Sequence, residues 1–297
     1  YRGKLLLTDQ KTSGERVYVI SDLHGESERL GHIVSESTYD EDSVFVFLGD
    51  LIDRGKNSLR VVLVVAFLCT YAKCYVLRGN HEQMFLDDTT GGCDTENCLD
   101  TDIDKMAGIR SKVHFKEMVK AFFRTFPILL KLDDYLYCHG GVPASSDGKD
   151  VANLNEYPAI NKKDRNKKDP MEQIYQEVMW NDYDTTLSGL FKINTERVVM
   201  DDKNNPTTPY NLYRPDHVIE FLQKHGKAKA LIHGHSHTVD ETNFGFGFDV
   251  KNIQNIKTIE EINYACFVTH FGIPKYIARH LVISQNRFSV VKTGGYK

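Results

Sequence analysis

The stretch "SVFVFLGDLIDRG" (43–55) joins a short apolar run to a cluster of polar residues, and this arrangement indicates the class of fold. The run is rich in Val and Phe and has no polar alternation, which predicts a strand that is buried on both faces. Gly49 and Asp50 follow at once, and such residues end strands. The same arrangement occurs in "RVYVISDLHG" (16–25), "CYVLRGNHE" (74–82), "DYLYCHGG" (134–141) and "ALIHGHSHT" (230–238). The sequence therefore predicts five buried strands with polar residues at their carboxyl ends.

Helical patterns lie between these strands. They cover residues 27–37, 58–72, 113–132 and 214–229. Ser58 is a candidate N-cap, Pro127 should end the third helix, and Pro215 stands near the start of the fourth. Strands that alternate with helices predict an α/β layer architecture. Three further apolar runs without helices between them are expected to form a second sheet packed on the first, namely 264–272, 276–284 and 287–292.

The chain is expected to form one domain over residues 1–297, with long connectors at 87–112 and 144–178. Long connectors in compact domains usually belong to a functional rim, so we expect these two to shape substrate choice rather than the chemistry. The second connector contains "NKKDRNKKD" (161–169), a charge run of the kind that usually forms a solvated surface.

Composition excludes several classes of protein. Of the 297 residues, 41% are hydrophobic and 26% are charged, as in ordinary globular proteins. The net charge of −4 gives the chain no general attraction for nucleic acid. The longest apolar run, "VVLVVAFLC" (61–69), is far shorter than the roughly 20 residues that cross a membrane. No signal peptide is recognisable, and because the sequence begins at Tyr1 rather than Met, we expect a trimmed chain that has lost any targeting segment.

The chain has six cysteines, whose expected redox state indicates the cellular compartment. Cys74, Cys138 and Cys266 lie in apolar runs and are expected to pack in the core. Cys93 and Cys98 lie in a polar loop, where cysteines pair or bind metal. We expect free thiols there, because a chain of this length does not need disulfides for stability. This predicts a reducing, cytoplasmic location.

Polar side chains follow every one of the five strands. In open α/β sheets, ligand sites form outside the carboxyl ends of the strands. The residues at those ends are Asp22, His24, Asp50, Asp53, Arg54, Asn80, His81, Glu82, His139, His233, His235 and His237. Carboxylate, amide and imidazole groups suit Mn, Fe or Zn, and no thiolate is among them. A single Asp or His after a strand is usually a turn residue, but five such motifs in order indicate a shared metal site.

These motifs resemble a known family. "SDLHG" (21–25), "GDLIDRG" (49–55), "RGNHE" (78–82) and "HGG" (139–141) are similar in type and order to those of the calcineurin-like metallophosphoesterase superfamily. Two further stretches, "FPILLKLDDYLYCHGGVP" (126–143) and "MWND" (179–182), resemble its phosphoprotein phosphatase branch. The likeness covers about residues 14–143 and 214–238. It implies an α/β fold in which two mixed β-sheets form a central sandwich flanked by helices.

The resemblance implies a two-metal site of Mn, Fe or Zn, with Mn expected to support activity. Asp22 and His24 would hold the first ion, and Asp50 would bridge both ions. The second ion would be held by Asn80, His139 and His235. Two ions at roughly 3.5–4 Å clamp an ester and activate a bridging water, which attacks phosphorus in line.

The resemblance also implies roles for residues beside the ligands. His81 would be the general acid for the leaving group, and Asp53 would orient its imidazole. Arg54 would bind phosphate oxygens with its planar fork, and Arg214 is a looser candidate for the same role. The structural alternative is that Asp53 and Arg54 pair only with each other and that His81 is part of the scaffold; the motif context favours the functional roles.

The fifth motif departs from the phosphoprotein phosphatase pattern. That branch usually shows Arg-Ala-His, whereas "GHSH" (234–237) follows the Gly-His-x-His pattern of other superfamily members. Alternate residues of an extended segment share a face, so His233, His235 and His237 are all able to point at the site. The pattern favours His235 for the second ion and His237 for the first, with His233 contacting neither. Ser21 replaces the usual Gly, and no "SAPNYC"-type loop is found, which indicates a divergent or bacterial-like member.

The leading interpretation is a metal-dependent phosphatase that acts on phosphoserine or phosphothreonine in a phosphoprotein or phosphopeptide. A second is a nucleotide hydrolase, similar to the diadenosine tetraphosphatases and their mRNA-decapping relatives, in which residues 161–169 would bind polyphosphate or RNA. A third is an inactive scaffold that keeps the fold. The filled ligand positions speak against the third, and the acidic charge balance speaks against RNA.

Overall fold

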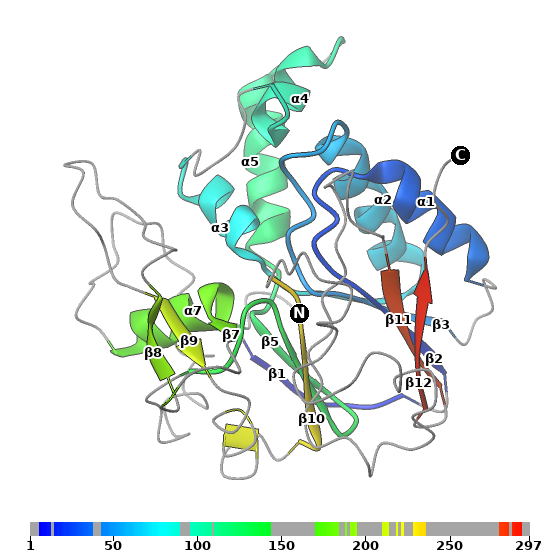
Figure 1. Ribbon diagram of the computed structural model, residues 1–297. Helices are drawn as coiled ribbons and strands as arrows, with labels where there is room; N and C mark the ends of the chain where they lie inside the picture. The colour runs from blue at the N-terminus through cyan, green and yellow to red at the C-terminus, as the bar shows by residue number, and fades with distance from the viewer. Residues whose placement is uncertain are drawn as a thin grey trace.

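The computed structural model in Figure 1 covers the motifs identified above in large part. It describes residues 6–12, 15–37, 43–89, 96–108, 110–143, 170–183, 191–194, 210–213, 228–235, 279–284 and 287–292, together with 188, 218, 221 and 222. Within these residues no helix is long and apolar enough to span a membrane.

One mixed sheet carries the first three motifs. Its strand order is β12-β11-β2-β3-β4. The strands β2 (Arg16–Ile20), β3 (Ser43–Phe47) and β4 (Lys73–Val76) run parallel. The strands β11 (Arg279–Ser284) and β12 (Arg287–Lys292) add an antiparallel edge beside β2. Because β2, β3 and β4 point the same way, their carboxyl ends meet at one edge of the sheet.

A second mixed sheet carries the fourth and fifth motifs. It has the order β1-β5-β6-β10. Its strands are β1 (Leu6–Gln10), β5 (Leu129–Leu132), β6 (Tyr135–Cys138) and β10 (Ala230–His233). The last two run parallel, so the polar residues that follow them also emerge together. A small third sheet consists of β7 (Asp182–Tyr183), β9 (Tyr210–Tyr213) and β8 (Phe191–Asn194).

The alternation of side chains along the strands builds the layers. In β3, Val44 and Val46 enter a buried cluster that also contains Tyr135 and Tyr137 of β6, so the two large sheets pack face to face. Phe45 and Phe47 point the other way, into the cluster shared with the helices beside the first sheet. The strand β6 likewise turns Leu136 and Cys138 toward α7. All of β3 and β6 is buried, because both faces of these two strands are covered.

Helices cover the outer faces of the sandwich. α1 (Ser27–Glu36) and α2 (Ser58–Tyr71) lie against the first sheet, and α7 (Pro170–Trp180) lies on the far side, against the second (Figure 1). α4 (Leu99–Lys105) lies against α2, and α5 (Lys112–Phe123) contacts both α4 and α3 (Asn80–Leu86) (Figure 1). α5 ends before Pro127, as expected. The predicted helix at 214–229 falls almost wholly outside the described residues.

Three expectations from the sequence were wrong. The C-terminal strands extend the first sheet instead of forming the second, because Leu281 and Ile283 pack between the sheets while Val282 faces the helices; the run at 264–272 lies outside the described residues. The N-cap of α2 is Asn57, and the hydroxyl of Ser58 instead accepts the amide of Asp53 at 2.9 Å.

The third error concerns the cysteines. Cys98 is disulfide-bonded, so a free thiol there is excluded and the argument for a reducing compartment weakens. Cys74 and Cys138 are free and buried, as expected.

Candidate metal centre

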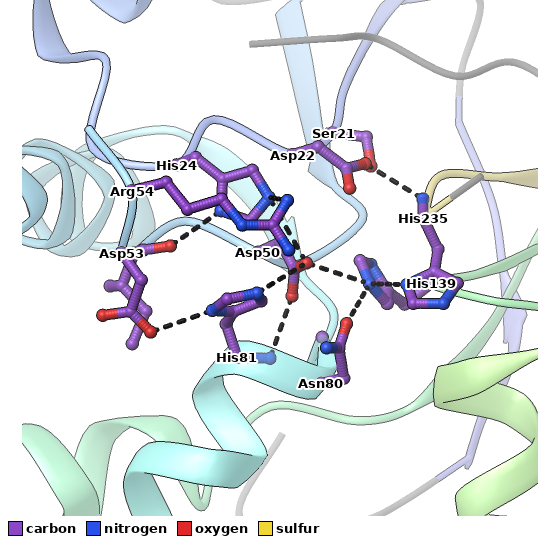
Figure 2. A network of polar contacts seen from close by, with 12 residues as sticks. Ser21, Asp22, His24, Asp50, Asp53, Arg54, Asn80, His81, His139 and His235 are labelled. Atoms are coloured by element: carbon purple, nitrogen blue, oxygen red, sulfur yellow. Dashed lines mark hydrogen bonds and ion pairs between the residues drawn. The ribbon is translucent and has the colours of Figure 1, made fainter. Parts of the chain in front are cut away.

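Asp50 lies at the centre of a buried cluster of polar side chains (Figure 2). Its Oδ2 is 3.6 Å from Nε2 of His24, 4.0 Å from Nε2 of His81 and 3.3 Å from Nε2 of His139. Two sets of ligand atoms, each within 4.8 Å of one another, share this carboxylate. One set is His24, Asp50 and His81, and the other is Asp50, His139 and His235. The two sets together contain one residue from each of the five motifs and share Asp50.

Two of the imidazoles are oriented by backbone carbonyls. Nδ1 of His24 lies 2.9 Å from the carbonyl oxygen of Ile52, and Nδ1 of His139 lies 2.9 Å from that of Leu48. A carbonyl only accepts, so Nδ1 carries the hydrogen in both rings and Nε2 is turned toward Asp50. Histidines that bind metals almost always donate their other nitrogen in this way.

The surroundings of Nε2 of His139 fit a cation. Asn80 Oδ1 is 2.9 Å away, His235 Nδ1 is 3.1 Å away and Asp50 Oδ2 is 3.3 Å away. A single ring N–H serves one acceptor well, whereas a metal ion binds all of these donor atoms together. The donor set of imidazole, amide and carboxylate groups therefore fits a Mn, Fe or Zn ion.

The charge of Asp50 dominates the electrostatics of the cluster. Burial raises the pKa of this carboxyl, but His139, His81 and His24 outweigh burial and hold the pKa well below its usual range. Burial lowers the pKa of His139, yet the charge and hydrogen bond of Asp50 raise that pKa to about 9. The Asp50 carboxylate is thus ionised at neutral pH and lies among three imidazoles.

Asp22 joins the second group through the backbone. Its Oδ2 accepts the amide of His235 at 3.1 Å and the hydroxyl of Ser21. A side chain at Gly234 would overlap the side chains of Ser21 and Asp22, so glycine is required there for close approach. The Asp22 carboxylate, expected to bind the first ion, lies in neither of the two ligand sets, although it lies between them in Figure 2.

Glu82 holds the motif loops together. Its carboxylate accepts three backbone amides: those of Asp50 and Gly79, both at 2.9 Å, and that of Leu51 at 2.8 Å. Burial and the charge of Asp50 raise the pKa of Glu82 to about 7, and the three amides oppose this rise. Glu82 therefore positions the loop that carries Asp50 without entering the ligand sets.

His81 and Asp53 form a hydrogen-bonded pair beside the cluster. Nδ1 of His81 lies 2.9 Å from Oδ2 of Asp53, and both side chains are buried. Nδ1 therefore carries the hydrogen and Nε2 faces the cluster. Arg54 is exposed, and its guanidinium lies 3.3 Å from Nε2 of His24, at the rim of the site (Figure 2).

The backbone is strained at the same residues. Eight described non-glycine residues have a positive φ, and six of them belong to the motifs, namely Asp22, His24, Asp50, Asp53, Arg54 and His235. Such conformations cost of order 1–3 kcal/mol each and persist where a functional site requires them.

The histidine that was expected to contact neither ion lies apart from both ligand sets. His233 is buried at the end of β10, with Nδ1 2.8 Å from the carbonyl oxygen of Gly234, and it belongs to neither ligand set. Burial lowers its pKa to about 3, so it is neutral. His237 and Arg214, like the connector at 144–169, lie outside the described residues.

Comparison with known proteins agrees with this geometry. A family model described as calcineurin-like phosphoesterase matches residues 15–239. The chain belongs to this family. Membership confirms the family predicted from the motifs, and the enzyme class that it implies is a metal-dependent hydrolase of phosphoester bonds.

One curated relative of this calcineurin-like phosphoesterase is a serine/threonine-protein phosphatase with EF-hands from Mus musculus. It is 30% identical over 153 residues, which are 49% of this chain and 19% of the relative. The match therefore spans about a fifth of the relative's length.

Two solved structures share the fold. A serine/threonine phosphatase from Saccharomyces cerevisiae, described as similar to human phosphatase PP5, has a TM-score of 0.68 and 14% identity over 98% of this chain and 84% of its own. A cold-active protein-tyrosine phosphatase from a psychrophilic Shewanella species has a TM-score of 0.60 and 16% identity over 97% and 83%. The predicted fold class, two mixed sheets with flanking helices, is confirmed.

Proposed function

We propose that this calcineurin-like phosphoesterase is a phosphomonoesterase with two metal ions. One ion would lie with Asp22, His24 and Asp50, and the other with Asp50, Asn80, His139 and His235. The observation that carries the proposal is the sharing of the Asp50 carboxylate by two ligand sets, one with His24 and His81 and the other with His139 and His235. We assign Asp22 to the first ion in place of His81, because His81 is bonded to Asp53 and is proposed to transfer a proton. A carboxylate between two cations offsets their repulsion, which a site for one ion does not need.

Metal ions bound there would supply Lewis acidity for the phosphoryl oxygens and would lower the pKa of bound water. The remaining steps belong to the chain's own residues. The exposed guanidinium of Arg54 beside His24 is suited to bind phosphate oxygens, because its planar fork matches them. His81, held at Nδ1 by Asp53, presents Nε2 to the cluster and would give its proton to the leaving oxygen.

For the substrate we propose phosphoserine or phosphothreonine in a protein. Support comes from the relative with EF-hands, whose name describes a serine/threonine-protein phosphatase. The rival nucleotide substrate depended on the lysine-rich residues 161–169, which lie outside the described residues. No other described feature favours it.

A side-by-side assay tests the substrate. The chain would be loaded with Mn²⁺ and given equal concentrations of phosphoserine, phosphothreonine and phosphotyrosine peptides, a dinucleoside tetraphosphate and capped RNA. We expect the phosphoserine and phosphothreonine peptides to have the highest kcat/KM, and Asp50→Asn to abolish turnover of each. Preference for the dinucleotide or the cap would replace the substrate but keep the mechanism, whereas turnover that survives chelation would remove both.

A further inference from the structure

The carboxylate of Asp53 is held by two partners from different parts of the chain. Oδ2 bonds to Nδ1 of His81 at 2.9 Å. Oδ1 accepts the backbone amide of Leu99, the first residue of α4, at 3.2 Å. The sequence motif explains the first bond only, since Leu99 lies in the connector expected to shape substrate choice.

The amide of Leu99 is available for this bond because of its place in the helix. The first N–H groups of a helix have no acceptor within it. The preceding residue, Cys98, has an extended backbone with φ −100° and ψ 156° and is disulfide-bonded. A covalent link thus restrains the chain immediately before the amide that reaches Asp53.

Apolar packing and a second hydrogen bond also hold α4 against α2. Leu99 and Ile103 are buried in the same apolar cluster as α2. In the opposite direction, Asp102 of α4 accepts the amide of Leu59, in the first turn of α2, at 3.1 Å. The first turn of α4 therefore donates an amide to Asp53, which precedes α2, and the first turn of α2 donates an amide to Asp102 of α4. The contact is reciprocal, which holds α4 against the loop that carries Asp53.

Two bonds to one carboxylate fix its rotation. With only the bond to His81, the carboxylate of Asp53 would rotate about its Cβ–Cγ bond and the imidazole would rotate with it. The amide on Oδ1 removes this freedom, so Oδ2 stays directed at Nδ1 of His81. A proton donor must be held in reach of the leaving oxygen, and small displacements cost rate.

We propose that the peptide N–H of Leu99 is a positioning group for the general acid, acting on His81 through Asp53, and that the disulfide at Cys98 keeps it in place. The proposal rests on the proposed function, in which His81 protonates the leaving group. It assigns the connector at 87–112 a part in the chemistry.

A pair of variants isolates the amide. Leu99→Pro removes the N–H at the first helical position, where proline is tolerated and where the extended backbone of Cys98 suits the residue before a proline. Leu99→Ala loses the buried side chain but keeps the N–H, so it is the matched control. Both variants would be loaded with zinc, and their metal content compared with that of the parent.

Two readouts follow, one independent of activity. The first is the NMR resonance of the Nδ1 proton of His81 in the diamagnetic zinc form, which we expect to shift in Leu99→Pro relative to Leu99→Ala. The second is turnover of phenyl phosphate and p-nitrophenyl phosphate. Loss of a hydrogen bond to a charged group should lower phenyl phosphate turnover about tenfold relative to the alanine variant. The loss should be smaller for p-nitrophenyl phosphate, whose leaving group needs less protonation.

The outcomes separate the two ideas. An unchanged His81 resonance and equal turnover in the proline and alanine variants overturn the positioning role. A parent chain without phosphatase activity overturns the proposed function and the catalytic consequence, while the resonance still decides whether the amide orients His81. Cys98→Ser should shift both readouts in the same direction by less than Leu99→Pro; no shift in either removes the disulfide from the proposal.

Discussion

At the scale of single residues, the carboxylate of Glu82 explains how the ligand loops keep their shape. Two oxygens accept three buried amides, and no other side chain type of this size offers only acceptors. Glu82→Gln would turn an NH₂ group toward at least one amide. We expect the free energy of unfolding in urea to fall by about 1–3 kcal/mol, the cost of an unsatisfied buried group.

The exposed Glu28 on α1 provides the control for this substitution. Glu28→Gln should stay within about 0.5 kcal/mol of the parent, as surface changes usually do. If the two variants unfold at the same urea concentration, the three amides at Glu82 do not stabilise the loops.

The two described histidines of "HGHSHT" give a second residue-scale prediction. His235 faces His139 and Asp50, whereas His233 bonds to the carbonyl of Gly234. His235→Ala should therefore lose the second metal ion, and His233→Leu should keep both ions and change mainly stability. Elemental analysis of the purified variants measures this. Retention of two ions by His235→Ala would place that residue outside the ligand set.

The sequence predicted most of the cluster because its residues directly follow strands. Asp50, His139 and His24 are ligand types at positions where parallel strands end, and that pattern is local. Other contacts link residues that are apart in the sequence. Glu82 bonds to residues 31 and 32 positions away, Leu99 to a residue 46 positions away and Ser58 to a residue 5 positions away. The two longer-range contacts depend on how helices pack against the loops, and a backbone amide such as that of Leu99 carries no residue-type signal at all.

At the scale of elements, β11 contains a buried histidine with a consequence for acid stability. Burial lowers the pKa of His280 to about 4, below its ordinary 6.5. Between these values the unfolded chain binds a proton that the folded chain does not, so stability falls as pH decreases from about 6.5 toward 4. The effect is at most about 2 kcal/mol between pH 7 and pH 5.

His280→Leu should remove this contribution. Urea unfolding at pH 7 and pH 5 should show a smaller loss of stability in the variant than in the parent. An equal loss in both proteins would mean that His280 takes up its proton without unfolding of β11.

The position of β11 also marks the limit of element prediction. Its residues were correctly expected to form a strand, but the sheet was wrong. Runs buried on both faces have no alternation that distinguishes one sheet from another. Pairing with β2 over Leu281–Val19 and Ile283–Val17 is a long-range choice. For the same reason, the sequence did not predict that β6 and β10 belong to the second sheet.

At the scale of the whole molecule, two sheets bring their strand ends to one place. β2, β3 and β4 deliver three motifs from the first sheet, and β6 and β10 deliver two from the second. The packed faces between them fix the distance from Asp50 to His139. Neither sheet alone contains the full ligand set that we propose for the second ion, so the proposed metal centre requires both sheets.

A direct test exists for the proposal that Asp50 joins two metal ions in a phosphatase. It is a titration of chelated protein with Mn²⁺, in which bound metal and p-nitrophenyl phosphate turnover are measured on the same samples. We expect turnover in the parent to appear as two ions bind per chain, and Asp50→Asn to bind fewer ions and lose nearly all turnover. Full turnover in the metal-free parent, or parental metal content and turnover in Asp50→Asn, would contradict the claim.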